Sequence, residues 1–147
     1  MNRRDFIKGA AAAGLALRFG PGALDGQAAS IGPLPVLAAV EGESPAAITR
    51  AAIDLLGGMK AFVSKGDKVV IKPNIGWDRT PEMAACTNPE VVKTLVELVL
   101  DAGAKKVVVI DNTTNEAKRC YVRSGIQDAV KQAGGDMLFV ADYRVKK

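Results

Sequence analysis

"TNPEVVKTLVELVLDAGAKKVVVIDN", residues 87–112, is the stretch that decides the fold. Asn88 and Pro89 are suited to begin a helix, because a proline at the first helical position favours a helix start. Val91, Leu95 and Leu98 follow at helical spacing, and a glycine then ends the helix. The next run, "KKVVVI", is rich in β-branched residues. The stretch therefore predicts a helix followed directly by a buried strand at 105–110.

The same alternation of apolar runs and capped helices extends in both directions along the chain. Further strands are predicted at 34–40, 68–71 and 137–140, and further helices from Ser44 to about Leu56 and from Ser124 to a Gly-Gly stop. Capping-box spacings support two of the helix starts, Thr87 with Glu90 and Ser124 with Gln127. Strands that alternate with helices of this length predict right-handed crossovers and a mostly parallel sheet. We therefore expect an α/β domain of about four strands and three helices, with helices on both faces of the sheet, as in a three-layer sandwich.

Composition limits the classes of function that this chain can perform. Its 147 residues suit one domain, and the formal net charge is +4. The charges of the domain region interleave in sign, without a basic stripe or an aromatic ladder, so we expect no nucleic-acid partner. The chain contains no histidine, which excludes a Ser-His-Asp or Cys-His catalytic unit and a histidine metal site within it.

The N-terminus carries a pattern of its own. Arg3, Arg4, Phe6 and Lys8 resemble the twin-arginine export signal, Arg-Arg-x-Phe-Leu-Lys, and a short Ala- and Gly-rich stretch follows. We expect a signal peptide at 1–28, a linker at 29–34 and the α/β domain at 35–147. The twin-arginine translocation machinery is then a partner, and the destination is the periplasm. After cleavage of the signal we expect no stable insertion in the membrane.

Polar residues follow the predicted strands at the points where those strands end. Lys72 and Asn74 come after the second strand, and Asp111 and Asn112 after the third. The carboxyl ends of parallel strands meet at one edge of a sheet, which is where ligands bind in such folds. These four residues are therefore the predicted ligand-binding residues, and they suit an anionic or carboxylate ligand or a metal ion held by oxygen atoms. No strand is followed by a dinucleotide-type glycine fingerprint, so NAD is not predicted.

The loop after the second strand is longer than the usual connection between a strand and a helix. It carries Trp77, Asp78 and Arg79, which argues against a featureless linker. It also carries Cys86, whereas Cys120 follows the third strand. The two cysteines are candidate metal ligands. A disulfide in an oxidising compartment and two unrelated thiols are the alternatives.

Three segments of this chain resemble one family. "GDKVVIKPNIGW", the stretch at 87–112 and "RCYVRSGIQDAVKQAGGD" are similar to the N-terminal half of the family of domain of unknown function 362. The resemblance implies a Rossmann-like α/β fold and an association with iron–sulfur segments, but no agreed activity. Members continue into a second half, so we expect an incomplete domain here. This sequence lacks the ferredoxin-type cysteine cluster that some members carry.

The leading functional hypothesis is an exported protein that binds a ligand or redox cofactor at the carboxyl edge of its sheet. An iron–sulfur cluster with thiolates from Cys86 and Cys120 is the sharper version. The first alternative is a metal-free enzyme that uses Lys72 and Asp111 on a small anionic substrate. The second is a non-catalytic solute-binding or accessory module for a small-molecule or redox partner.

Overall fold

A computed structural model describes residues 37–140, and the N-terminal signal residues therefore lie outside the described part. In the described part, three parallel strands form one open sheet in the order β1-β2-β3. The register pairs Val70 with Val108, and Ile110 with Leu138. The strands are β1 (Lys68–Ile71), β2 (Lys106–Asp111) and β3 (Asp136–Phe139).

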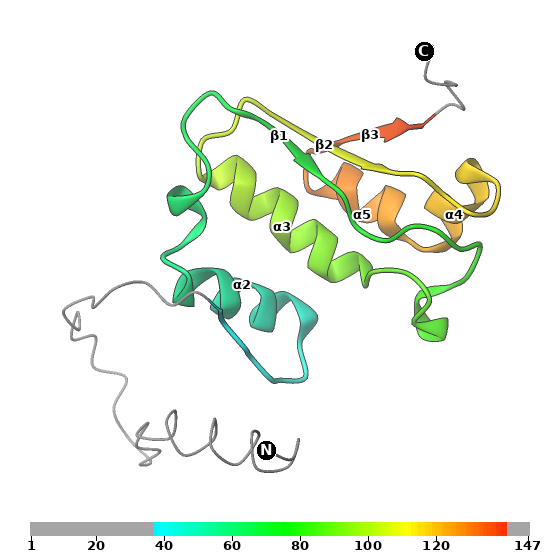
Figure 1. Cartoon of the computed structure of the whole chain (residues 1–147), viewed down its shortest axis with the longest axis horizontal. Coiled ribbons are helices and arrows are strands. Elements are labelled where there is room, and N and C mark those ends of the chain that lie inside the picture. The colour runs from blue at the N-terminus through cyan, green and yellow to red at the C-terminus, as the bar shows by residue number, and fades with distance from the viewer. Residues whose placement is uncertain (1–36, 141–147) are drawn as a thin grey trace, which may run out of the picture. The chain divides into compact units, whose positions relative to one another are not determined.

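Within residues 37–140, four α-helices accompany the sheet: α2 (Pro45–Leu55), α3 (Pro89–Asp101), α4 (Ala117–Arg123) and α5 (Ile126–Gln132). Two single 3₁₀ turns lie in the connections, η1 (Met59–Ala61) and η2 (Pro81–Met83). Helices α3 and α5 pack side by side and contact β2 and β3 respectively, whereas α2 packs against α3. Figure 1 shows this order of sheet, α3 with α5, and then α2. The structure thus confirms the α/β class with a parallel sheet.

The core lies between the sheet and α3 with α5. In β2, Val107, Val109 and Asp111 are buried and alternate with less buried residues, as expected for a strand with one covered face. From the helices, Val92, Val96, Ile126 and Val130 complete the centre of this core.

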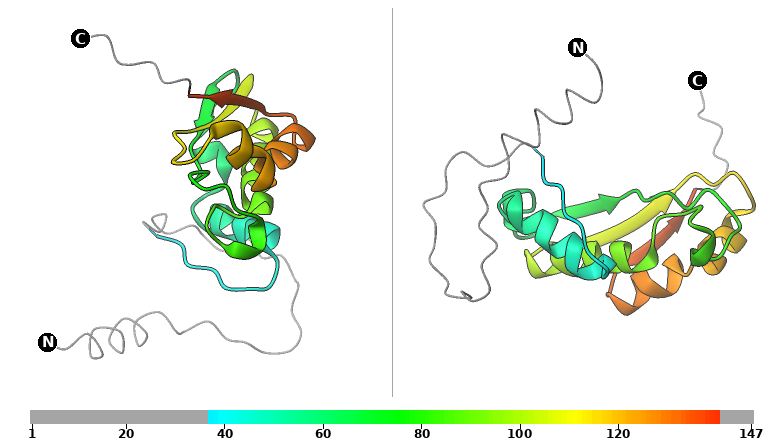
Figure 2. Two further views of the ribbon diagram at one scale, coloured as in Figure 1. Left: turned by 90° about the vertical axis from the view of Figure 1, so that its right-hand side faces the viewer. Right: turned by 90° about the horizontal axis from the view of Figure 1, so that it is seen from below.

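The expectation of helices on both faces is not met within residues 37–140. Figure 2 shows the helices gathered on one side of the sheet. The strand order explains this, because right-handed crossovers that step in the same direction place their helices on the same face. On the other face, Val70 is 65% exposed and Leu138 is 52% exposed.

The predicted strand at 34–40 is wrong in its described part. Residues 37–40 form neither helix nor strand, and Leu37 is exposed. Instead Ala38, Ala39 and Val40 line a hollow together with residues of α2. The apolar residues of this segment thus lie beside α2 and not in the sheet. The described sheet therefore has three strands, where four were expected.

The helix starts follow local side chains, with two differences from the prediction. Asn88 caps α3 by accepting a hydrogen bond from the amide of Glu90 at 2.8 Å, while Thr87 accepts instead from the amide of Asn74 at 2.9 Å. Ser124 ends α4, and Gly125, with φ 74°, begins α5. The predicted capping boxes are therefore not formed. Helix α4 is a further difference, because the sequence predicts no helix between the strand at 105–110 and the helix that begins at Ser124.

Candidate functional site

The loops after β1 and β2 meet at the carboxyl edge of the sheet. The loop between β1 and α3, residues 72–88, runs toward α4 (Figure 1). Its centre is held by the carbonyl oxygen of Gly76, which accepts hydrogen bonds from the amides of Thr114 at 2.9 Å and Asn115 at 3.2 Å. Ile75 beside it is fully buried. The long loop is therefore an ordered platform joined to the segment after β2, not a free linker.

Lys72 and Asp111 form an ion pair at this edge, with Nζ 2.5 Å from Oδ1. The lysine side chain is 68% exposed, whereas the aspartate side chain is 5% exposed. The other carboxylate oxygen accepts a hydrogen bond from the amide of Ile75 at 2.6 Å. The buried carboxylate therefore links the end of β2 to the β1–α3 loop, and it holds a cationic group at the edge of solvent.

The environment of Asp111 favours its charged form. Burial acts to raise the pKa, but hydrogen bonds from Lys72 and from the amides of Ile75 and Asn112, with the lysine charge, outweigh it. The pKa of Asp111 is therefore below its ordinary value. At neutral pH Asp111 is therefore a carboxylate.

The two predicted asparagines have different surroundings. The side chain of Asn74 works within the loop, because its Nδ2 donates to the carbonyl of Ala85 at 3.2 Å and its Oδ1 accepts from the amide of Gly76 at 3.0 Å. Asn112 is exposed directly after β2. The structure thus brings Lys72 and Asp111 into contact and places both asparagines at the same edge, with Asn74 engaged in shaping the loop.

Tyr121 also lies at this edge and is not among the residues predicted for the site. It is fully buried, and its hydroxyl accepts from the amide of Asp111 at 2.7 Å. The hydroxyl also lies within donating distance of the carbonyls of Asp111 (2.9 Å) and Leu138 (3.2 Å). Burial raises the pKa of Tyr121, so the phenol stays protonated. Tyr121 therefore joins the ends of β2 and β3 beneath the Lys72–Asp111 pair.

The two cysteines lie against the same loop. The thiol of Cys86 donates to the carbonyl of Trp77 at 3.3 Å, and that of Cys120 donates to the carbonyl of Gly76 at 3.8 Å. Both are free thiols, and burial, together with nearby negative charge, raises the pKa of Cys120. No group of three or more Cys, Asp, Glu or His residues in the described part could hold a metal ion. This part of the chain thus offers two thiols at one place, which is fewer ligands than an iron–sulfur cluster needs.

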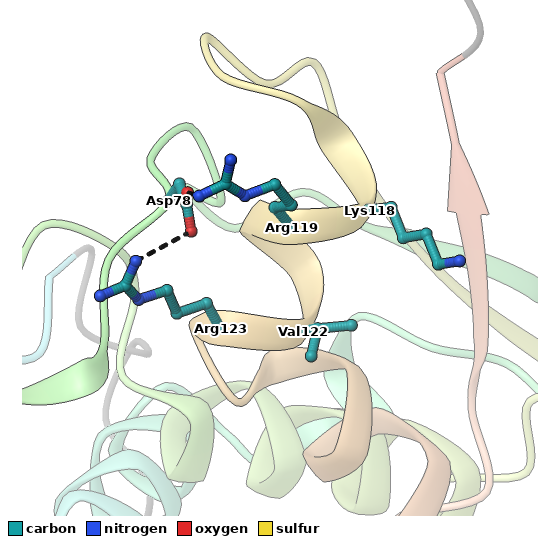
Figure 3. A pocket seen from close by; sticks show the side chains of 5 residues that line it. All are labelled: Asp78, Lys118, Arg119, Val122 and Arg123. Carbon is teal, nitrogen blue, oxygen red and sulfur yellow. Dashed lines mark ion pairs between the residues drawn. The ribbon is translucent and has the colours of Figure 1, made fainter.

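A hollow of about 320 Å³ lies beside α4 at this edge, and no motif in the sequence predicts it. It is lined by Asp78, Lys118, Arg119, Val122 and Arg123. Figure 3 shows the two arginines directed toward Asp78 and Lys118 extending away from it. Arg119 Nη2 lies 2.5 Å from Oδ2 of Asp78, and Arg123 Nη1 lies 3.6 Å from Oδ1. Once α4 is recognised as a helix, the spacing of Arg119 and Arg123 indicates one helix face.

None of the helices in residues 37–140 is long and apolar enough to cross a membrane.

A curated relative, a thylakoid-associated protein of Synechocystis sp., is 42% identical over 65 residues. The matched region covers 44% of this chain and 20% of the relative, so the chain spans about a fifth of that protein's length. The search of solved structures returned no match.

Two family profiles match the chain. The twin-arginine translocation pathway signal sequence matches residues 1–17, which include Arg3, Arg4, Phe6 and Lys8. The protein is therefore exported through the twin-arginine pathway, and the translocation machinery is its partner in transit. The domain of unknown function DUF362 matches residues 69–146, more than half of the chain and nearly all of the sheet and site described above. The chain thus belongs to the DUF362 family.

Proposed function

We propose that this protein is a periplasmic binding protein that holds a small anionic ligand at the carboxyl edge of its sheet. The observation that carries the proposal is the Lys72–Asp111 pair, in which a buried carboxylate fixes a mostly exposed ammonium group where β1 and β2 end. Ligands of open parallel sheets bind at this edge. The export signal supports the location outside the cytoplasm.

The geometry suits the capture of an anion. The ammonium group of Lys72 has three N–H donors, and Asp111 accepts from one of them. The charge of Asp111 is also compensated by the amides of Ile75 and Asn112, so that Lys72 is not its sole partner. The remaining donors of Lys72 are free to meet a carboxylate or phosphate from solvent. Asn112 is exposed and follows Asp111 at the same edge of the sheet, so its side chain is a further contact for the ligand in this proposal.

Ligand-dependent melting tests this proposal. The full-length protein is screened against small carboxylates and phosphates, and a ligand that binds the native state raises the melting temperature. Lys72→Met should abolish that increase, because it keeps the aliphatic stem and removes the charge. Lys68→Met is the matched control, since Lys68 is an exposed lysine at the opposite end of the same strand. An equal increase in wild type and Lys72→Met would contradict the proposal.

Turnover decides between a binding module and a metal-free enzyme. Lys72 and Asp111 are the pair that would act on a small anionic substrate, with the lysine as the group that meets it. A ligand identified by melting is incubated with the protein and followed by mass spectrometry. Chemical conversion that Lys72→Met abolishes supports the enzyme. Binding without conversion supports the non-catalytic module.

A redox cofactor is the second candidate, and the convergence of Cys86 and Cys120 on successive carbonyls of one loop favours it. The two thiolates would be two ligands of an iron–sulfur cluster whose other ligands come from outside residues 37–140. Anaerobic purification followed by iron and labile-sulfide assays tests this. Metal-free protein with a Cys86–Cys120 disulfide would contradict it.

The Rossmann-like three-layer sandwich is likewise part of the proposal. The exposed apolar residues on the open face of the sheet, Val70 and Leu138, support a further layer over that face. A signal peptide through residue 28 and a linker at 29–34 complete the proposed organisation, with the domain beginning at residue 35.

A further inference from the structure

The hollow beside α4 combines two cationic groups with one buried carboxylate. Asp78 is 8% exposed, while the side chains of Arg119 and Arg123 are each more than half exposed. Each guanidinium has five N–H donors, so most donors of both arginines remain available to a ligand. The hollow of about 320 Å³ is at the lower end of the range for small-molecule sites, about 300–1,000 Å³.

The two oxygens of Asp78 are not equivalent. Oδ2 is engaged by Arg119 at 2.5 Å, whereas Arg123 lies 3.6 Å from Oδ1, beyond hydrogen-bonding distance. Among the described residues, Oδ1 of Asp78 is the buried side-chain oxygen or nitrogen that has no hydrogen-bond partner. A buried acceptor without a donor costs about 1–3 kcal/mol, more when it is charged. The site therefore has an acceptor that a ligand's donor would satisfy.

The position of Asp78 is set from its backbone. Its amide donates to Oδ1 of Asn115 at 3.1 Å, and its carbonyl accepts from Nη1 of Arg79 at 2.8 Å. Both bonds lie on the main chain, so they restrain the carboxylate without using its oxygens. Arg123, on the next turn of α4 from Arg119, approaches the same carboxylate from the other oxygen (Figure 3). Oδ1 of Asp78 is covered in this structure, so the half-exposed side chain of Arg123 has to turn aside to admit a ligand to it.

We propose that this hollow binds an oxyanion that carries its own hydroxyl, namely inorganic phosphate. The charged oxygens accept hydrogen bonds from Arg119 and Arg123, and the hydroxyl of the phosphate donates to Oδ1 of Asp78. This inference goes beyond the proposed function, because it names a second anion site, with lining residues of its own, and the class of anion that it takes.

The chemistry of Asp78 makes the site selective. At neutral pH inorganic phosphate keeps at least one hydroxyl, whereas sulfate has none. Sulfate would place an acceptor against the acceptor Oδ1, and the two negative groups would repel each other. Phosphate should therefore bind and sulfate should be rejected, although both are tetrahedral and similar in size.

The test is a titration of the purified full-length protein with inorganic phosphate and with sodium sulfate at the same ionic strength, followed by calorimetry. Wild type should bind phosphate at least about tenfold more tightly than sulfate. Arg123→Gln removes a charged donor and should weaken phosphate binding by about tenfold or more. Lys131→Gln is the matched control, since Lys131 is an exposed cation on α5 outside the hollow, and it should bind phosphate as wild type does.

Asp78→Asn separates a ligand site from a structural ion pair. An amide can donate as well as accept, so this variant should bind sulfate and lose the preference for phosphate. A structural ion pair predicts no anion binding in either protein. If Arg123→Gln does not fold, Arg123→Lys and Asp78→Asn still provide the comparison, because both keep a polar group at their position. Equal affinities of wild type for phosphate and sulfate would overturn the inference.

Failure of this inference and failure of the proposed function are distinguishable. Phosphate binding that Lys72→Met abolishes and Arg123→Gln leaves unchanged would overturn the α4 site and keep the proposed function. Loss in Arg123→Gln with normal binding in Lys72→Met supports the α4 site and contradicts the role given to Lys72. Absence of phosphate binding together with a melting response to a carboxylate that requires Lys72 would overturn the α4 site alone.

Discussion

The hydroxyl of Tyr121 accepts a hydrogen bond from the amide of Asp111 at 2.7 Å and lies 2.9 Å from the carbonyl oxygen of the same residue. One side chain from α4 thus satisfies both backbone groups at the end of β2. The same hydroxyl is 3.2 Å from the carbonyl of Leu138 in β3, and the ring lies 4.7 Å from that of Phe139 between centroids. The ends of β2 and β3, which present the candidate site, are therefore joined by a side chain of a helix that the sequence does not predict.

Replacing Tyr121 by Phe tests this role. The change keeps the ring and leaves the buried amide of Asp111 without its acceptor, which should lower the free energy of unfolding by about 1–3 kcal/mol. Urea denaturation followed by circular dichroism measures the difference. Val122→Ala, at an exposed neighbour in the same helix, should change it by less than about 0.5 kcal/mol. Equal effects of the two changes would contradict the bridging role.

Acid should destabilise the protein through Asp111. Its pKa is lowered in the folded state, so its contribution to stability is present above the ordinary pKa of about 3.9 and is lost as the pH falls through the lower, folded value. Urea denaturation at a series of pH values should show the free energy of unfolding falling below about pH 4. Asp111→Asn should flatten part of that fall. An unchanged acid slope in the variant would show that Asp111 is not responsible.

The two thiols should differ in reactivity in the reduced, folded protein. Cys120 is fully buried and burial raises its pKa, whereas Cys86 is partly exposed. Since the thiolate is the reactive form, iodoacetamide at neutral pH should label Cys86 first. Mass spectrometry of the labelled peptides measures the order, and in denaturant both cysteines should react at similar rates. Faster labelling of Cys120 in the folded protein would contradict the burial described here.

Residues 37–140 place no layer over the open face of the sheet, so the 147-residue chain should bind apolar dyes at that face. Val70 and Leu138 are exposed there, although both lie in strands. The double variant Val70→Thr with Leu138→Thr places threonine, a residue that favours β-strands, at both positions and reduces the apolar surface. It should therefore lower the fluorescence of bound anilinonaphthalene sulfonate. Leu55→Thr, an exposed leucine on α2, serves as the control and should have little effect. Unchanged fluorescence in the double variant would place the dye elsewhere.

Much of the fold could be predicted from the sequence because the signals are local. The strand at 68–71 was predicted with the bounds that the structure gives, and the starts of α2 and α3 follow from a capping residue and a proline adjacent in sequence. The strand at 34–40 was wrong for the opposite reason. Its apolar run is compatible with a strand or with packing beside a helix, and only contact with α2 distinguishes the two.

The location of the candidate site was also predictable, but its chemistry was only partly so. Parallel strands place their carboxyl ends together, so Lys72 and Asp111 could be assigned to one edge from their positions after apolar runs. Nothing in the sequence indicates that Asp78, in the loop after β1, would meet Arg119, which lies 41 positions further along the chain. Their pairing depends on α4, a helix of seven residues that lacks a clear apolar period.

The sequence by itself determined the export signal, the family, the α/β class and the edge where polar residues gather. These features depend on helix caps, hydrophobic periodicity and short motifs, all of which involve residues close together in the chain. The tertiary structure decided which face of the sheet is covered, how Tyr121 joins two strand ends and how Asp78 meets two arginines. Those features arise from contacts between residues far apart in the chain. Their energy depends on distance and burial, and neither exists until the strands pair and the helices pack.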